Sequence, residues 1–496
     1  MHHAYFDDAA PTEDLHRRSL HGGAISMIGQ GGNLAVQVVS TIVLARILLP
    51  EDFGLVAMIS AVTGYASICV DLGTRDAVAQ RGRVNEGEMS ALFWITFAVG
   101  LALTAITVLS APLVARFYAE PRLEHIAMAM SLTLVLPALS CQQSALMRRA
   151  LMFRKLAAID FGGNLLGSVL AIVLAYRGYG YWALVWKPVL TALLTALGVW
   201  IICGWWPKRP RFTAGVRELL GFGLNVTGFT IADIVTRSAD RVALGYTTGA
   251  EELGYYQTAF TVYANALQVC APLHNVATAT LSKLRSDAAA LKRAWSTAIS
   301  SLTYFAAPAF AILAVIAQDL VVLMLGSKWR TAGAILTILA LRGPAHVVER
   351  TAGWLHVTAG RPERWRRWGI LNCIATLVAL FCGLPFGAFG VAAAYTTLTY
   401  VLFVPAIVYA GKPLGIGVGD ISRAVGPQIL TALGSAAVGL LLRHTLLRDT
   451  PPLARLLTLG ILCSALYLGA IAVGFRMTRP LTVAASLVRA RNFGIE

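Results

Sequence analysis

Charged residues are scarce in this sequence. They make up 13% of the 496 residues, whereas 57% of the residues are hydrophobic and the mean hydropathy is +0.67. A soluble globular chain carries about 25% charged residues, so the composition excludes that class. Alternating apolar and polar segments are also lacking, which excludes a membrane β-barrel. The remaining class is an all-α polytopic membrane protein, with apolar residues for roughly fourteen spans of ~20 residues.

Cysteine and histidine motifs are lacking as well. The seven cysteines occur singly, in or beside apolar runs, and no Cys-x-x-Cys or Cys/His spacing is present. We therefore expect neither a disulfide nor a metal site, and no cofactor. A cleavable signal peptide is not visible either, because the first twenty residues are polar and the first apolar run is long enough to span. We expect that run to insert as an uncleaved anchor.

One corner motif occurs twice. Leu44–Leu55 closes one apolar run and opens the next, which predicts the tight corner of a helical hairpin. Pro50 suits the first turn of the second helix, and the acidic pair after it complements the positive helix end. Leu244–Tyr255 repeats the acidic pair, the bulky apolar residue and the glycine at the same offset. The sequence therefore predicts a duplicated unit.

The similarity between the two copies continues downstream with small shifts. Ala111–Val114 resembles Gln318–Val321, and Leu146 in an arginine-rich hairpin aligns with Leu355 in another. We expect fourteen spans, each placed within about three residues, at 22–45, 53–75, 89–111, 124–146, 157–176, 180–203, 218–241, 252–275, 296–317, 331–356, 368–384, 387–410, 420–442 and 453–475.

The net charge of +16 is unevenly distributed between the loops. Of the 41 basic residues, 27 lie in the two tails and the loops of one parity, and 10 lie in the loops of the other parity. This asymmetry is typical of the positive-inside rule, so both termini are expected in the cytoplasm. It argues against a nucleic-acid partner.

The domain plan follows from the repeat and the spans. Each unit crosses the membrane an even number of times, so the two units enter with the same orientation. The predicted parts are a cytoplasmic tail at 1–20, a six-helix lobe at 21–206, a cytoplasmic linker at 207–217, a second six-helix lobe at 218–411, two further spans within 412–475 and a cytoplasmic tail at 476–496.

Several segments resemble a known family. They are Leu44–Arg46 with Pro50–Gly54, Leu92–Trp94, Ala111–Tyr118, Met147–Arg154 and Gly178–Val185. On these segments the chain resembles the Wzx-type polysaccharide exporters of the multidrug/oligosaccharidyl-lipid/polysaccharide flippase superfamily, close to the branch with colanic acid exporters. The second half matches more weakly, through Leu253–Tyr256 and the fourteen-span plan.

The resemblance implies a transporter and not an enzyme. It implies that an undecaprenyl-diphosphate-linked oligosaccharide is flipped across the bacterial inner membrane by alternating access between two lobes. The implied partners are this lipid-linked substrate, membrane lipids, and a polysaccharide polymerase or export machinery. A proton or sodium gradient could drive the cycle, and the sequence leaves this coupling open.

Ionisable residues within the spans are the candidates for substrate contact. Each costs about 2.5–3.5 kcal/mol at mid-membrane, so each needs a partner or a water-filled cavity. Arg342 lies near mid-span beside Gly343-Pro344, which should break helix hydrogen bonding, and arginine supplies bidentate donors for a diphosphate. The substrate-cavity candidates are Arg342, Lys187, Arg237, Asp233, Glu349 and Arg350, and the gate or interface candidates are Arg46, Asp71, Arg75, Asp240 and Arg241.

Structural roles compete with these assignments. Asp233 and Arg237 are one turn apart and could neutralise each other. Asp240 and Arg241 could form a helix-end pair at the outer interface, and Asp71 with Arg75 could be gate contacts or snorkelling charges. Glu349 and Arg350 could bond the two lobes instead of touching substrate.

Two other functions also fit the sequence. A drug or cation antiporter of the same superfamily would share the two-lobe plan, but we expect it to centre on intramembrane carboxylates. A polysaccharide polymerase or glycosyltransferase would need a sizeable aqueous loop or interfacial carboxylates, and no predicted outer loop exceeds ~20 residues.

Overall fold

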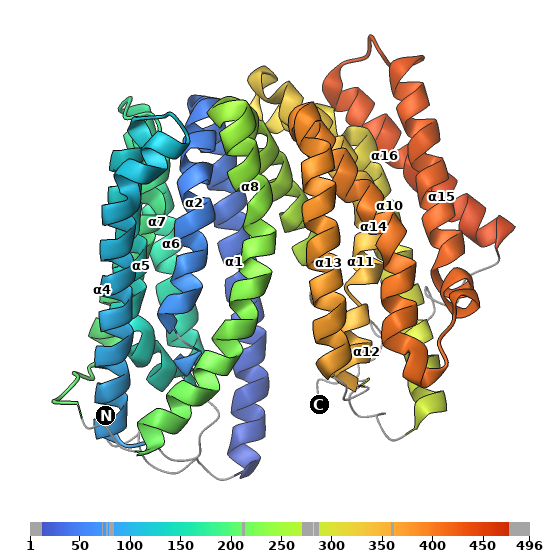
Figure 1. The fold of residues 1–496 in the computed structure, drawn as a ribbon. Helices are drawn as coiled ribbons and strands as arrows, with labels where there is room; N and C mark the ends of the chain where they lie inside the picture. The colour runs from blue at the N-terminus through green and yellow to red at the C-terminus, as the bar shows by residue number, and fades with distance from the viewer. Residues whose placement is uncertain are drawn as a thin grey trace. The chain divides into compact units, whose positions relative to one another are not determined.

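The computed structural model describes residues 12–71, 73–75, 78, 84–210, 214–269, 281, 287–358 and 362–475 (Figure 1). All secondary structure in these ranges is helical, and they include nine helical segments that are long and apolar enough to cross a membrane. The chain is a multi-pass membrane protein, as the composition predicted. It divides into two compact units, the first ending at Gly254 and the second beginning at Tyr255.

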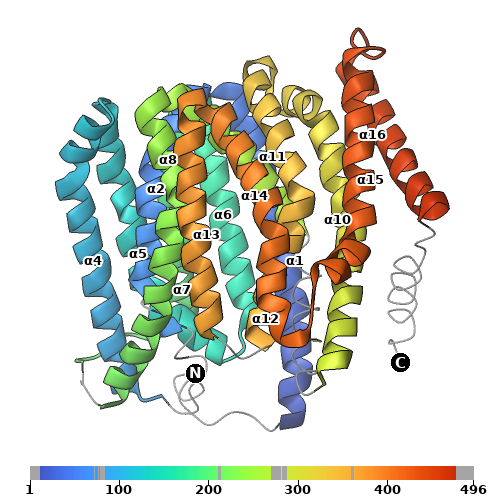
Figure 2. The same ribbon diagram turned by 45° about the vertical axis from the view of Figure 1, so that its right-hand side comes forward.

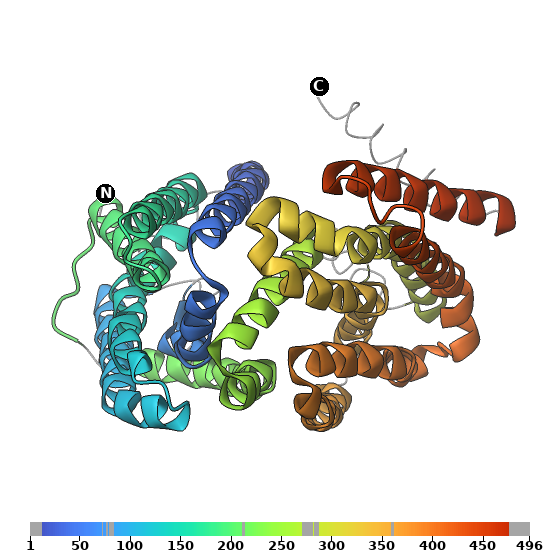
Figure 3. The ribbon, with the colours of Figure 1, turned by 90° about the horizontal axis from the view of Figure 1, so that it is seen from above.

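The first unit contains six helices and most of a seventh. They are α1 (Thr12–Ile47), α2 (Pro50–Asp71), α4 (Glu86–Phe117), α5 (Arg122–Arg149), α6 (Phe153–Tyr176), α7 (Trp182–Cys203) and α8 (Ala214–Val269), which continues into the second unit. Figure 3 shows the helices of this unit, coloured blue to green, nearly end-on and side by side. Gly249, with φ +83°, divides α8 into two helical parts.

The second unit contains the remaining helices. They are α10 (Ala288–Leu325), α11 (Arg330–Glu349), α12 (Ala352–Thr358), α13 (Pro362–Gly383), α14 (Gly387–Gly411), α15 (Val418–His444) and α16 (Pro452–Gly469). Equivalent helices pack alike in the two units. In the first unit α4 packs on α5 and α6 packs on α7, and in the second unit α10 packs on α11 and α13 packs on α14. Each of the fourteen predicted spans overlaps a helix, while the number of membrane crossings stays a prediction.

Local sequence explains where the helices begin. α2 begins at Pro50, and the Asp52 carboxylate accepts a hydrogen bond from the Leu49 N–H at 2.9 Å. Asp287 caps α10 by accepting from the N–H groups of Ala289 and Ala290. Such side chains satisfy amides that have no partner within the helix. The predicted hairpin corner before Pro50 is therefore confirmed.

The expected break at Gly343-Pro344 is wrong as a break in the helix, because α11 runs through both residues. Proline removes one hydrogen bond from the helix without ending it here. The Tyr400 hydroxyl donates to the Leu341 carbonyl at 2.8 Å, so a neighbouring helix stabilises this turn. The glycine is needed for packing, since a Cβ at Gly343 would lie 2.1 Å from Cγ of Phe310.

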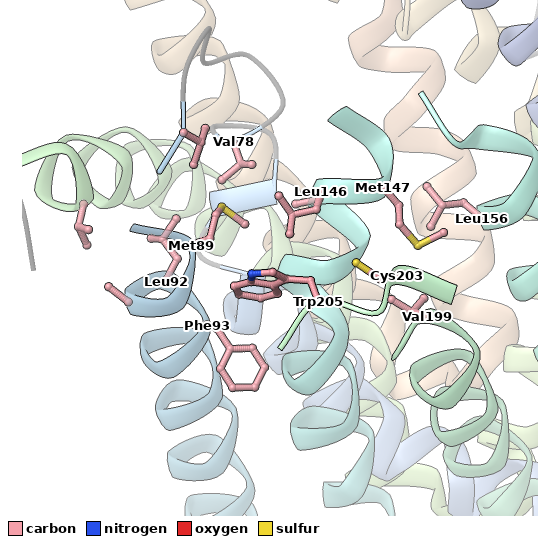
Figure 4. Packing of buried hydrophobic residues seen from close by; sticks show 14 of the residues in the cluster. Val78, Met89, Leu92, Phe93, Leu146, Met147, Leu156, Val199, Cys203 and Trp205 are labelled. Atoms are coloured by element: carbon pink, nitrogen blue, oxygen red, sulfur yellow. The ribbon is translucent and has the colours of Figure 1, made fainter. Parts of the chain in front are cut away.

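A buried cluster at one end of the first unit includes the chain that follows α7 (Figure 4). Trp205 is fully buried and its ring lies 6.5 Å from that of Phe93 in a T-shaped arrangement. Lys208, within the predicted linker, pairs with Glu86 at 2.9 Å and donates its N–H to Ser90. These contacts hold the chain after α7 against the start of α4.

Helices α15 and α16 pack on α10 (Figure 2), and an ionic triad joins the three helices. Asp319 of α10 lies 3.2 Å from Arg443 and 2.6 Å from Arg455, and its side chain is 5% exposed. In the sequence repeat, the position of Asp319 corresponds to Pro112 in the first copy. The acidic residue therefore occurs in the copy that carries the two additional helices.

We expect Asp319→Asn to destabilise the second unit by about 3–5 kcal/mol, because it leaves the buried Arg443 and the half-buried Arg455 without a carboxylate. The measurement is the thermal unfolding midpoint of the purified protein. Asp449→Asn, at an exposed position, is the control and should leave the midpoint unchanged. Equal midpoints for both variants would contradict a role of the triad in stability.

The charge asymmetry also predicts membrane topology. Reporter fusions after residues 155, 213, 287 or 364 should report a cytoplasmic location, and fusions near 119, 248 or 449 a periplasmic one. A reversed pattern in either set would reject the fourteen-span topology.

Candidate functional site

Arg342 of α11 lies among polar and aromatic side chains of α14. Its Nε donates a hydrogen bond to Oγ1 of Thr399 at 2.7 Å, and its guanidinium carbon lies 5.7 Å from the centroid of the Tyr395 ring. No carboxylate lies within 4.0 Å of Arg342 among the residues that the structure describes. The positive charge is therefore held by a hydroxyl and a ring face, which leaves it available to an anion.

A tyrosine–histidine pair lies close to Arg342. The Tyr263 hydroxyl is 2.7 Å from Nδ1 of His346, and the two rings are stacked with centroids 6.0 Å apart. Tyr263 is 1% exposed and lies within electrostatic range of Arg342 and Glu349. These hydroxyl and imidazole groups can exchange hydrogen bonds with a polar ligand.

The other two candidates on α11 differ in exposure. Glu349 is half-buried and interacts electrostatically with Arg342, whereas Arg350 is exposed. The structure therefore brings Arg342 and Glu349 together with Tyr263 and His346. Sequence reasoning missed Tyr263, His346, Tyr395 and Thr399, because aromatic and hydroxyl residues are common in the spans and carry no signal of their own.

The candidates of the first unit have separate surroundings. Nζ of Lys187 on α7 lies 2.5 Å from Oγ of Ser40 on α1, and the Ser40 side chain is buried. The side chains of Asp233 and Arg237 lie outside the described residues. Lys187 is thus held by a neutral hydroxyl.

Four of the gate candidates form two local pairs. Asp71 pairs with Arg75 at 3.5 Å and lies 3.4 Å from Sγ of Cys141. Asp240 is 3% exposed and accepts a hydrogen bond from the N–H of Arg241. Arg46 is exposed near the end of α1.

The two copies of the corner motif pack against each other within the first unit. A Cβ added at Gly54 would lie 1.6 Å from the carbonyl oxygen of Ala250, and one added at Gly254 would lie 1.9 Å from that of Pro50. In the repeat, Pro50 corresponds to Ala250 and Gly54 to Gly254. The contact is therefore reciprocal, and only glycine allows this backbone approach, as in small-xxx-small helix crossings. We call these four residues the corner contact.

The surroundings of the corner contact are aromatic and charged. Arg122 pairs with both Glu51 and Glu120, with 2.7 Å between its Nε and Glu120. This hydrogen bond to the Arg122 guanidinium holds the pKa of Glu120 below its usual value. The rings of Phe117 and Tyr246 stack with centroids 4.8 Å apart. Residues from four chain segments thus converge at this end of the unit.

Comparison with known proteins agrees with this fold. A family model described as "Polysaccharide biosynthesis protein" matches residues 43–334, more than half of the chain. The chain belongs to this family. The resemblance to polysaccharide exporters inferred from the sequence is confirmed.

Curated relatives support the same assignment, and a solved structure supports the fold. The succinoglycan biosynthesis transport protein ExoT of Rhizobium meliloti is 25% identical over 72% of this chain and 73% of its own length. The lipopolysaccharide biosynthesis protein WzxC of Escherichia coli is 23% identical over 74% of this chain and 76% of its own. The solved structure titled lipid II flippase MurJ, inward closed conformation, has a TM-score of 0.70 at 14% identity. The match covers 91% of this chain and 99% of that structure. Because the sequence identity is low, the match shows the fold alone.

Proposed function

We propose that this protein flips undecaprenyl-diphosphate-linked oligosaccharide repeat units across the bacterial inner membrane, for the synthesis of a surface or exported polysaccharide. The observation that carries the proposal is Arg342, a charge in a membrane span held by Thr399 and Tyr395, with no carboxylate within 4.0 Å among the described residues. The names of the relatives, which concern polysaccharide biosynthesis and transport, support the substrate class.

Arg342 would bind the diphosphate of the lipid carrier. A guanidinium stays charged away from bulk water and offers two parallel donors to phosphate oxygens. The Tyr263–His346 pair and Glu349 would bind hydroxyl groups of the sugar or the water around them. In the first unit, the path of the substrate would be lined by Lys187, Arg237 and Asp233. In the second unit, Arg350 would line this path at the exposed end of α11.

The cycle would alternate between states open to the cytoplasm and to the periplasm. In this proposal the corner contact closes the periplasmic side, because loop charge places these corners outside. Asp71 with Arg75 would act at the cytoplasmic end, and Arg46, Asp240 and Arg241 near the outer end. Both termini lie in the cytoplasm in this proposal. No catalytic step is needed, and assembly with a polymerase is part of the expected pathway.

The composition of the site favours this function over an antiporter. Arg342 and Lys187 are cations without a carboxylate partner in the described part of the chain, whereas a site for cationic drugs calls for carboxylates. A polymerase or glycosyltransferase remains the alternative of another class.

Deletion of the gene tests the proposal. We expect lipid-linked repeat units to accumulate on the cytoplasmic leaflet, surface polysaccharide to be lost, and sensitivity to cationic drugs to stay unchanged. Drug sensitivity with normal polysaccharide would support the antiporter instead. Single repeat units that reach the periplasm but are not polymerised would support a polymerase.

A further inference from the structure

Two aromatic–basic–basic triplets lie near the start of equivalent helices. Phe153-Arg154-Lys155 begins α6, and Trp365-Arg366-Arg367 lies in the first two turns of α13. These helices pack on α7 and α14 respectively, as the repeat requires. Leu146 precedes the first triplet by seven residues, and the aligned Leu355 precedes the second by ten. The triplets therefore lie near the start of equivalent helices, with a shift of three residues between the two copies.

In both helices a stripe of exposed apolar side chains follows the basic pair, directly after the pair on α13 and about three turns after it on α6. On α13 the stripe includes Ile370, Ile374, Val378 and Phe381, each more than half exposed. On α6 it includes Leu166, Val169, Val173 and Tyr176. Steps of three or four residues keep each stripe on one helix face. In a multi-pass protein such a face meets lipid, so the basic pairs lie at the level of the lipid head groups.

The four cations lack carboxylate partners in the part of the chain that the structure describes, unlike other cations on the same predicted side. Lys208 pairs with Glu86, and Lys292 pairs with Asp420 at 2.7 Å. Arg364, which directly precedes the α13 triplet, donates a hydrogen bond to the Tyr409 carbonyl at 2.5 Å, and its guanidinium lies over the Tyr409 ring. By contrast Arg154, Lys155, Arg366 and Arg367 are all exposed.

The aromatic member of the α13 triplet is held in place. The Trp365 ring stacks on His356 of α12 at 6.3 Å between centroids, with an interplanar angle of 3°. Trp365 is still 39% exposed. A ring fixed at this depth holds the adjacent arginines at the membrane surface.

We propose that the two triplets are binding sites for the phosphate groups of anionic phospholipids in the cytoplasmic leaflet, one site on each unit. The basic pair supplies charge-assisted hydrogen bonds to the phosphate, and the apolar stripe contacts the acyl chains. The sites lie on the exposed faces of α6 and α13, and they share no residue with the surroundings of Arg342. This proposal does not depend on the transported substrate.

Native mass spectrometry of the purified full-length protein tests the proposal. Phosphatidylglycerol and phosphatidylcholine with identical acyl chains serve as probes. We expect Arg154→Gln with Lys155→Gln, and Arg366→Gln with Arg367→Gln, each to weaken phosphatidylglycerol binding. The loss should be about 5-fold for each charge removed, and roughly 30-fold for a pair at its own site. Phosphatidylcholine binding should not change.

The matched control is Arg116→Gln with Arg448→Gln, which removes two exposed charges at ends predicted to lie outside. It should leave phosphatidylglycerol binding intact. An equal loss in the control would overturn the proposal, because net charge alone would then explain the effect. Unchanged phosphatidylglycerol binding in both triplet variants would overturn the proposal too. The same holds if the triplets bind undecaprenyl diphosphate but do not bind phosphatidylglycerol. If the double variant does not fold, the single variants Arg366→Gln and Arg367→Gln test the same prediction, and each should weaken phosphatidylglycerol binding by about 5-fold.

Discussion

Gly254→Ala should reduce polysaccharide export strongly while the protein still reaches the membrane in normal amounts. The new Cβ would lie 1.9 Å from the Pro50 carbonyl oxygen, so the two helices must separate. Overpacking of this kind costs about 1–3 kcal/mol. If the corner contact closes the periplasmic side, that cost shifts the closed–open equilibrium by roughly 5- to 150-fold. Gly54→Ala should have a similar effect, because its Cβ would meet the Ala250 carbonyl.

Gly64→Ala is the control for this prediction. Gly64 is on the same helix as Gly54, and a Cβ there would meet nothing within 4 Å. Export by this variant should equal that of the wild type. Normal export by both Gly54→Ala and Gly254→Ala would show that the corner contact does not need to close. Loss of the protein from the membrane would assign the glycines to folding.

Arg342→Ala should abolish export without lowering the amount of protein. Removing one partner of a buried charge-assisted contact costs about 2–5 kcal/mol, so transport should fall by roughly 30-fold or more. Folding should not suffer, because the Thr399 hydroxyl also donates to the Tyr395 carbonyl and keeps a partner. Arg342→Lys should retain part of the activity, since charge remains while bidentate geometry is lost. Arg342→Glu should be inactive through repulsion of the diphosphate.

The measurement combines surface polysaccharide, lipid-linked repeat units on the inner leaflet, and protein quantity by immunoblot. Arg330→Ala, at an exposed position in the first turn of the same helix, is the matched control and should export normally. Full export by Arg342→Ala would exclude a substrate role. Disappearance of the protein in that variant would show that Arg342 serves as a bond between helices.

The helices could be predicted well because each apolar run is long and is bounded by turn or basic residues. The corner before Pro50 was predicted in detail, since proline and the acidic pair act locally. That the two copies of the corner touch could not be predicted. The repeat shows that Gly54 and Gly254 are equivalent, but only tertiary packing brings each to the other's carbonyl partner.

The candidate site could be predicted in part. Arg342 stood out because a lone charge in a membrane span needs a reason. Its partners Thr399 and Tyr395 depend on the register between α11 and α14, which the sequence does not show. Asp319 was missed as half of an ionic contact, because Arg443 and Arg455 are more than 120 residues away in the chain.

The most direct test of the account is flipping by the purified protein in proteoliposomes. A fluorescent undecaprenyl-diphosphate oligosaccharide is incorporated into both leaflets. The labelled lipid is then depleted from the outer leaflet. Finally, the fraction of the remaining label that an impermeant quencher can reach is followed over time. We predict that the wild type moves the lipid to the outer leaflet and that Arg342→Ala does not, at equal protein content. Equal movement in liposomes with wild-type protein, with Arg342→Ala and without protein would contradict the central claim.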